Sequence, residues 1–115
     1  MALPHAQALD VIDLQPLGEG LREAVTTSLL KEPSLQLIRL VLPAGGGMPD
    51  HHVDGAITIH CLEGQAEIGT PQRTCTLSAG QLVMIEGGMT HNVRAITEAS
   101  LLVTIMLDKV GGGPG

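Results

Sequence analysis

Aromatic side chains are missing from this 115-residue sequence, which contains no Phe, Tyr or Trp. Without aromatic rings, no nucleic-acid base can stack on a protein platform, and no sugar or planar ligand can be held between rings. The absence also removes tyrosine as a general acid and as a thioether partner for cysteine. Functions that depend on aromatic stacking are therefore excluded.

Positive charge is also scarce. Six Lys and Arg residues stand against twelve Asp and Glu, which gives a formal net charge of -6. The basic residues are scattered along the chain and form no cluster. Because nucleic-acid binding needs concentrated positive charge, we expect no nucleic-acid partner.

Cysteine and long apolar runs are the other shortages. Cys61 and Cys75 are not closely spaced, so we expect two reduced, mostly buried thiols and no disulfide. No apolar run in the sequence approaches the ~20 residues that span a bilayer. Residues 1–6 lack the basic and apolar segments of a secretory signal. We therefore expect a cytoplasmic protein with no membrane partner.

The chain does contain many short segments with the pattern of β-strands. Hydrophobic residues make up 43% of the sequence, enough for the core of one domain. Alternating or β-branched segments between Gly and Pro turns predict strands at residues 9–14, 24–30, 35–42, 56–62, 65–68, 73–77, 82–85, 91–96 and 100–107. This spacing is typical of an all-β barrel or sandwich, and no long helix is predicted. We expect the barrel over residues 8–110, between a flexible N-terminus (1–7) and a flexible Gly-rich tail (111–115).

The last predicted strand differs from the others because residues 101–107 (LLVTIML) are almost uninterrupted apolar. In an antiparallel sheet this pattern indicates a strand that is covered on both faces. One face belongs to the barrel interior, and the other can pack against a partner subunit. We therefore expect a homodimer.

Two histidine-bearing motifs lie at residues 47–52 (GMPDHH) and residues 80–91 (GQLVMIEGGMTH). Because strand patterns flank both motifs, we expect these side chains to converge inside a closed β-barrel. The first motif begins with a glycine-rich turn. The arrangement predicts a small pocket lined by histidine.

The segment from residue 40 to residue 107 resembles the cupin family, whose small β-barrels carry two sequence motifs. The second family motif reads Gly, five residues, Pro-x-Gly, two residues, His, three residues, Asn. Its spacing is matched here by Gly80, Glu86 in the proline place, Gly88, His91 and Ala95 in the asparagine place. The resemblance implies an all-β fold, a single double-stranded β-helix (cupin or jelly-roll) barrel.

The first family motif reads Gly, five residues, His-x-His, three or four residues, Glu, six residues, Gly. Gly64 matches the closing glycine, and counting back places Ile57 where the family has its metal-binding glutamate. The histidine pair fits in two registers. In one, His51 is the first histidine and Val53 replaces the second; in the other, His52 is the second and residue 50, an aspartate, replaces the first.

The resemblance also implies a metal site. In metal-binding cupins the two first-motif histidines, the glutamate and the second-motif histidine hold one divalent ion. Here the implied ligands are His51, His52 and His91, and the ion is one divalent transition metal (Fe, Ni, Cu, Zn or Mn), with Asp50 or Asp54 as a replacement for the missing carboxylate. Such a protein would act on a small polar molecule, with bound water or oxygen as the reactive partner. Adjacent histidines on an extended chain point to opposite faces, so one of His51 and His52 faces solvent.

The alternative is a metal-free, non-catalytic cupin barrel that binds a small molecule or retains only a vestige of the site. The interior predicted from alternation is apolar enough for it, with Ile57, Ile59, Cys61, Val83 and Ile85. His60 falls on the opposite face of its strand, where we expect packing or a subunit contact. The residues do not decide between the two hypotheses, and they name neither a substrate nor an enzymatic activity.

Overall fold

Eight of the nine strand segments predicted from the sequence assemble into two antiparallel sheets. The computed structural model describes residues 5–107, so the predictions for residues 1–4 and 108–115 lie outside it. In the described part, one short 3-10 helix precedes the strands, and the elements in chain order are η1 (Gly18–Glu23), β1 (Thr27–Glu32), β2 (Leu35–Leu42), β3 (Gly47–His51), β4 (Ile57–Glu63), β5 (Gln65–Gly69), β6 (Thr74–Ser78), β7 (Leu82–Ile85), β8 (His91–Ala95) and β9 (Ala99–Met106). Within residues 5–107, no helix has the length and hydropathy needed to cross a membrane.

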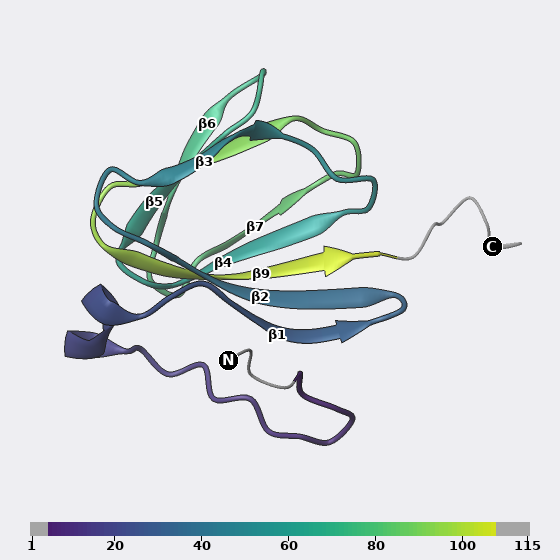
Figure 1. Ribbon diagram of the computed structural model, residues 1–115. Helices are drawn as coiled ribbons and strands as arrows, with labels where there is room; N and C mark the ends of the chain where they lie inside the picture. Colours follow the sequence, from purple (N-terminus) through teal and green to yellow (C-terminus); the bar gives the residue numbers. More distant parts are fainter. Residues whose placement is uncertain (1–4, 108–115) are drawn as a thin grey trace, which may run out of the picture.

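The two sheets face each other as the layers of a jelly roll (Figure 1). One sheet has five strands in the order β1-β2-β9-β4-β7, and the other has four in the order β3-β8-β5-β6. Strands that are distant in sequence therefore lie side by side, as with β2 and β9. The jelly-roll fold predicted from the sequence is confirmed.

The centre of the five-stranded sheet is β9, which pairs with β2 on one side and β4 on the other. Its pairing with β2 runs in unbroken register from Leu35 opposite Met106 to Leu42 opposite Ala99. A central strand with apolar residues on both faces explains the continuous apolar pattern that the sequence shows there.

The core lies between the sheets and follows the two-residue alternation of strands. Ile57, Ile59 and Cys61 of β4 are buried, as predicted, and Leu101 of β9 and Ile85 of β7 join them. Thr58 and His60 alternate with them on the outer face, where His60 lies opposite Leu102 and Leu82 of the neighbouring strands.

Gly64 makes the tight connection from β4 to β5. Its φ of +83° is in the left-handed region, and a Cβ there would lie 2.1 Å from the carbonyl oxygen of Glu98. A glycine is therefore required by both the backbone and the space. This is the glycine that closes the first sequence motif.

Two sequence predictions about strands were wrong. Residues 9–14 form no strand, because Leu9 has a φ of +72° and no backbone hydrogen bond joins residues 11–14 to a strand in the described part. Conversely, residues 47–51, predicted as a turn, form β3. Its Pro49 is tolerated because β3 is an edge strand that pairs only with β8.

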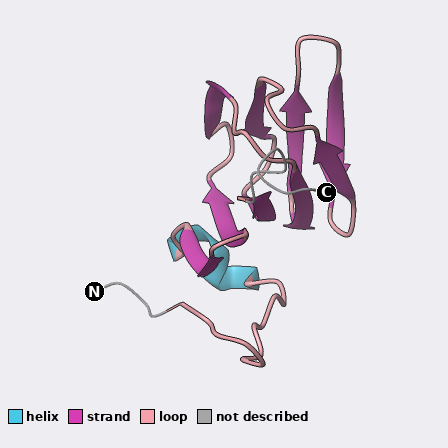
Figure 2. Cartoon of the chain, turned by 90° about the vertical axis from the view of Figure 1, so that its right-hand side faces the viewer, coloured by secondary structure: helices cyan, strands magenta, loops and turns pink. Residues whose placement is uncertain are grey.

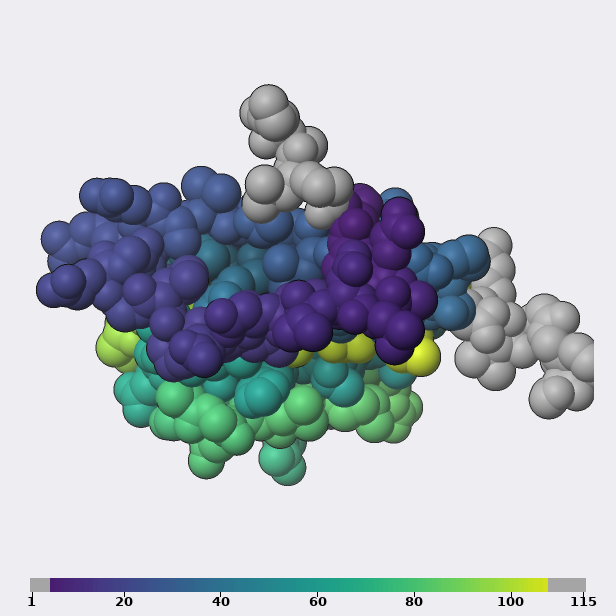
Figure 3. All heavy atoms as spheres, turned by 90° about the horizontal axis from the view of Figure 1, so that it is seen from below, coloured from purple at the N-terminus to yellow at the C-terminus, as the bar shows by residue number. Residues whose placement is uncertain are grey.

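Residues 5–23, which we call the N-terminal strap, run across the outer face of the five-stranded sheet. Figure 3 shows the purple strap between the blue of β1 and β2 and the green of later strands, and Figure 2 shows η1 in cyan on it. Arg39 of β2 holds the strap, because its Nη2 donates to the carbonyl oxygen of Gln15 at 2.8 Å. The same Nη2 lies 3.9 Å from a carboxylate oxygen of Glu63.

Glu63 secures the strap from the other side. Its Oε1 accepts hydrogen bonds from the backbone N–H of Leu17 at 2.7 Å and the hydroxyl of Ser100 at 3.2 Å, and its Oε2 accepts one from Gly18 N–H at 3.1 Å. We call Arg39 and Glu63 together the strap latch.

Candidate functional site

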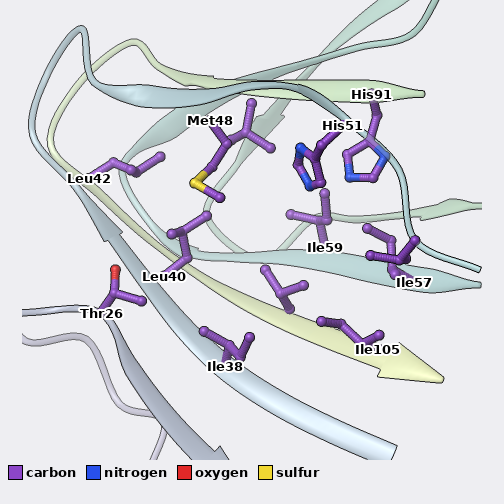
Figure 4. Close-up of a pocket in the computed structure, with 13 residues that line it drawn as sticks. Thr26, Ile38, Leu40, Leu42, Met48, His51, Ile57, Ile59, His91 and Ile105 are labelled. Carbon is purple, nitrogen blue, oxygen red and sulfur yellow. The ribbon is translucent and has the colours of Figure 1, made fainter. Parts of the chain in front are cut away.

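An apolar cavity of about 410 Å³ lies between the two sheets. One wall comes from the five-stranded sheet and the other from β3 and β8, so the site depends on the packing of segments distant in sequence (Figure 4). The cavity is lined by Thr26, Ile38, Leu40, Leu42, Met48, His51, Val53, Ile57, Ile59, His91, Val93, Val103 and Ile105. Within residues 5–107, this lining contains no Lys, Arg, Asp or Glu.

His51 and His91 are the polar side chains at one end of the cavity. They occupy directly opposed positions on β3 and β8, where cross-strand side chains come close together. Their ring centroids are 4.3 Å apart, and the planes are tilted by 59°. Figure 4 shows the two imidazoles side by side over Ile57 and Ile59. The structure thus brings together two of the three predicted site histidines.

Both imidazoles are oriented by the backbone through the same kind of contact. Nδ1 of His51 lies 2.9 Å from the carbonyl oxygen of Pro49, and Nδ1 of His91 lies 3.1 Å from that of Met89. A carbonyl oxygen only accepts, so each Nδ1 carries the proton and donates it. In the neutral ring the lone pair is then on Nε2, for which residues 5–107 provide no hydrogen-bond partner.

A β-bulge places His51 in the cavity. The register between β3 and β8 shifts between Met48 and His51, and a bulge of this kind redirects side chains. Both residues therefore line the cavity although they are three positions apart. Val53 follows on the same side, whereas His52 is exposed and outside the lining.

These positions decide the register of the first motif. His51 occupies the place of the first histidine, Val53 the place of the second, and Ile57, which is buried, the place of the glutamate. Two of the four ligand positions that the resemblance implies are therefore aliphatic. The structure does not bring the third predicted ligand, His52, close to His51 and His91. Its role as a ligand stays a prediction.

The donors at this site fall short of a metal centre with three protein ligands, which protein zinc sites generally require. Within residues 5–107, no group of three His, Cys, Asp or Glu side chains could hold a metal ion. Asp50 and Asp54 do not line the cavity, and the Asp50 carboxylate accepts a hydrogen bond from Asn92 Nδ2 at 2.7 Å. Neither aspartate replaces the missing glutamate.

The two cysteines lie outside the cavity lining, and both are free thiols. Cys61 is fully buried beside the carbonyl oxygens of Glu63 and Gly64. Burial raises the pKa of the Cys61 thiol, and the nearby Glu63 carboxylate raises it further, although the backbone contact at Glu63 works in the opposite direction. The thiol therefore stays protonated at neutral pH and is a core residue.

Sequence reasoning missed the aliphatic wall opposite the histidines. Ile38, Leu40 and Leu42 of β2, with Val103 and Ile105 of β9, line the cavity. The alternation in residues 35–42 separates these side chains from their neighbours, but it does not say which face meets the cavity. Met48 gave no such signal, because its orientation depends on the bulge.

Solved structures from several bacteria share this fold. A conserved protein of unknown function from Streptococcus pyogenes is similar with a TM-score of 0.74 and 20% identity, covering 96% of this chain and 97% of its own. A cupin superfamily protein from Desulfitobacterium hafniense has a TM-score of 0.70 and 15% identity, over 73% of this chain and 77% of its own. Bacillus subtilis oxalate decarboxylase, described with Mn(II) centers, has a TM-score of 0.61 and 17% identity, over 65% of this chain and 22% of its own. At these identities the likeness shows the fold alone.

The sequence itself identifies the family. No curated protein sequence matches the chain. The family model for the cupin domain, however, matches residues 38–107, a segment that contains every strand from β3 to β9 and both histidines of the cavity. This chain belongs to the cupin family.

Proposed function

We propose that this cupin binds a compact, largely apolar small molecule in the cavity between its sheets, with His51 and His91 as its polar anchors. One observation carries the proposal: two adjacent imidazoles, each with Nδ1 engaged by the backbone, are set in a wall whose other side chains are apolar except for that of Thr26. Ligand sites commonly combine apolar walls with a few placed polar groups in this way.

The size and chemistry of the cavity set the expected affinity. Burying one methylene group contributes roughly 0.8 kcal/mol, so a molecule of about eight carbons gains roughly 6 kcal/mol before the costs of association. Those costs are at least about 4 kcal/mol, so we expect simple probes to bind weakly, with dissociation constants of about 1 mM or higher, equivalent to no more than roughly 4 kcal/mol. A physiological ligand with better complementarity would bind more tightly.

A second candidate is a divalent transition metal bound by His51 and His91. The observation that favours it is the pair of Nε2 lone pairs, since neutral imidazole is a common metal ligand. Two protein ligands are one fewer than in catalytic zinc sites, so we expect weak binding that needs water or an added ligand. The hypothesis of turnover on a small polar molecule depends on this metal.

The two candidates are separated by one experiment on freshly purified, untagged protein. Metal content would be measured by inductively coupled plasma mass spectrometry. After treatment with EDTA, binding of p-xylene and p-cresol would be followed by saturation-transfer NMR and calorimetry. The chain has no Phe, Tyr or Trp, so no ring protons from these residues overlap with the signals of the probes. Substoichiometric metal with saturable probe binding is expected. A stoichiometric metal that disappears in a His51→Ala/His91→Ala variant would favour the second candidate.

A matched pair of variants tests whether probes bind in this cavity. Val103 lines it, whereas the next residue of β9, Thr104, points to the opposite face. Val103→Phe fills the cavity and is expected to weaken p-xylene binding at least tenfold, while Thr104→Phe leaves it unchanged. Circular dichroism would establish that both variants are folded. Equal weakening by both variants, or none by either, would contradict the proposal.

We also propose a homodimer formed through the part of the outer face of the five-stranded sheet that carries β7 and the end of β9, rather than the part that the N-terminal strap crosses. Leu82 and Met84 of β7 are 57% and 56% exposed there, and Met106 of β9 is 45% exposed. Such grouped apolar side chains mark interaction surfaces, and the apolar pattern of β9 supports a second copy as the partner. The cytoplasmic location remains a prediction.

Analytical ultracentrifugation tests the dimer. Leu82→Glu/Met84→Glu is expected to convert a dimer into a monomer. The control is Leu9→Glu/Val11→Glu, which charges two strap residues that are 100% and 96% exposed and is expected to leave the dimer intact. A wild-type protein that sediments as a monomer at high micromolar concentration would end this proposal.

A further inference from the structure

We infer that the cavity selects molecules that carry a neutral hydroxyl group on an apolar body, an apolar alcohol or a phenol, and discriminates against carboxylates and ammonium ions of the same size. The inference rests on the proposed binding function and specifies its ligand class. It follows from the hydrogen-bond state of two side chains and from the charges that the lining lacks.

The first step concerns the polarity that the histidines present to the cavity. Because the carbonyl oxygens of Pro49 and Met89 can only accept, the N–H of each neutral imidazole is used on Nδ1. Each ring then offers the cavity an acceptor, Nε2. Two acceptors at one end of a cavity are satisfied by a ligand that brings a hydrogen-bond donor.

The second step concerns charge. Within residues 5–107, the lining contains no side chain other than the two imidazoles that can carry a charge near pH 7. A carboxylate would present acceptors to acceptors unless the rings were protonated. Two positive rings with centroids 4.3 Å apart would repel each other. An ammonium ion can donate, but it would enter an aliphatic cavity that has no carboxylate to balance its charge.

The third step concerns where the ligand's two parts lie. Figure 4 shows the imidazoles together at one end and the thioether of Met48 with Leu42 and Leu40 toward the other. A ligand with its hydroxyl toward His51 and His91 would therefore place its apolar body against aliphatic side chains. A hydrocarbon of the same shape would make the apolar contacts and leave the two acceptors without a donor, which costs affinity.

The test is a set of four probes that share one aromatic body: p-cresol, p-xylene, 4-methylbenzoate and 4-methylbenzylamine. Their dissociation constants for EDTA-treated wild-type protein would be measured at pH 7.5 by calorimetry. We expect p-cresol to bind at least tenfold more tightly than p-xylene. We also expect p-xylene to bind more tightly than either charged probe.

Variants connect the preference to the histidines. His51→Leu/His91→Leu, which removes both Nε2 acceptors, is expected to reduce the p-cresol preference over p-xylene to less than threefold while p-xylene still binds. His52→Leu, on the adjacent exposed residue, is the matched control and is expected to keep the wild-type ranking. If His51→Leu/His91→Leu does not fold, the wild-type ranking alone decides the inference.

The outcomes separate this inference from the function on which it rests. If none of the four probes binds wild-type protein, the proposed binding function fails. If p-xylene binds as tightly as p-cresol, or if a charged probe binds best, the hydroxyl preference is overturned while the binding function stands. An unchanged preference in a folded His51→Leu/His91→Leu variant would also overturn it.

Discussion

A pair of polar side chains lies in mostly apolar surroundings on each side of the five-stranded sheet. Arg39 and Glu63 lie on its outer face, whereas His51 and His91 face its inner side from β3 and β8 of the other sheet, and the two pairs differ in their hydrogen bonds. On the outer face, Glu63 accepts two backbone N–H groups and one hydroxyl, and Arg39 donates to a strap carbonyl. On the cavity side, His51 and His91 are engaged through Nδ1 alone. Arg39 and Glu63 form their hydrogen bonds within the chain, whereas His51 and His91 each keep the acceptor Nε2 available.

The difference in hydrogen bonding distinguishes a pair of side chains that stabilises the fold from a pair that is available to a ligand. Buried polar groups cost free energy unless they have hydrogen-bond partners, so the strap latch is explained by the partners it gains on folding. One atom of the strap latch, Arg39 Nε, is buried and has no hydrogen-bond partner in the described part of the chain. The histidines gain less from the chain, and their open Nε2 atoms are the basis of the ligand binding proposed above.

The largest expected effect comes from restoring a carboxylate to the cavity. Ile57→Glu puts an acid at a position that is 4% exposed and lined by aliphatic side chains. An uncompensated buried charge costs about 3–5 kcal/mol, so we expect a loss of this size at pH 7 in metal-free protein, measured by urea unfolding. Burial raises the carboxyl pKa in the folded state, so the loss should shrink as the pH falls toward 4 and the unfolded-state carboxyl also protonates.

The same variant tests how close the cavity is to a metal centre. Ile57→Glu adds a carboxylate to the two imidazoles, so Zn²⁺ is expected to raise the unfolding midpoint of the variant well beyond its effect on wild-type protein. Ile57→Gln, which cannot supply a carboxylate, is the control. Equal stabilisation of both variants by Zn²⁺ would show that the metal acts elsewhere.

Breaking the strap latch is expected to have the second largest effect. Glu63→Ala removes the acceptor of three hydrogen bonds and leaves Arg39, whose side chain is 9% exposed, without its nearby carboxylate. We expect a loss of about 3 kcal/mol in the free energy of unfolding. The matched control is Glu67→Ala, because Glu67 pairs with Arg94 at 3.3 Å between side chains that are 37% and 63% exposed. That loss should not exceed about 1 kcal/mol, and equal losses would contradict the comparison.

The smallest effect is expected at the cavity pair. His51→Leu removes one local hydrogen bond and an Nε2 acceptor that has no partner in the chain, and it adds apolar surface to an apolar wall. We expect the free energy of unfolding to change by less than about 1 kcal/mol, because these terms oppose each other. A loss comparable to that of Glu63→Ala in the same urea titration would show that His51 is a structural residue.

Much of the fold could be predicted because local patterns and tertiary packing agree. The predictions for residues 35–42 and 82–85 coincide with β2 and β7, and the inward placement of Ile57, Ile59 and Cys61 follows from alternation. The failures occur where the two disagree. Residues 9–14 have an alternating pattern but no neighbouring strand to pair with, and β3 contains Gly and Pro yet is held by β8.

The sequence alone determined the all-β class and the exclusion of aromatic stacking, because these depend on composition and the period of a strand, and its motif spacings carried the resemblance to the cupin family. Only the tertiary structure decided that His51 rather than His52 joins His91, since a bulge in β3 sets that orientation. It also decided that β2 and β9 supply the aliphatic wall, and that the buried charges belong to the strap latch. These results depend on contacts between residues far apart in the chain, for which a single sequence holds no local signal.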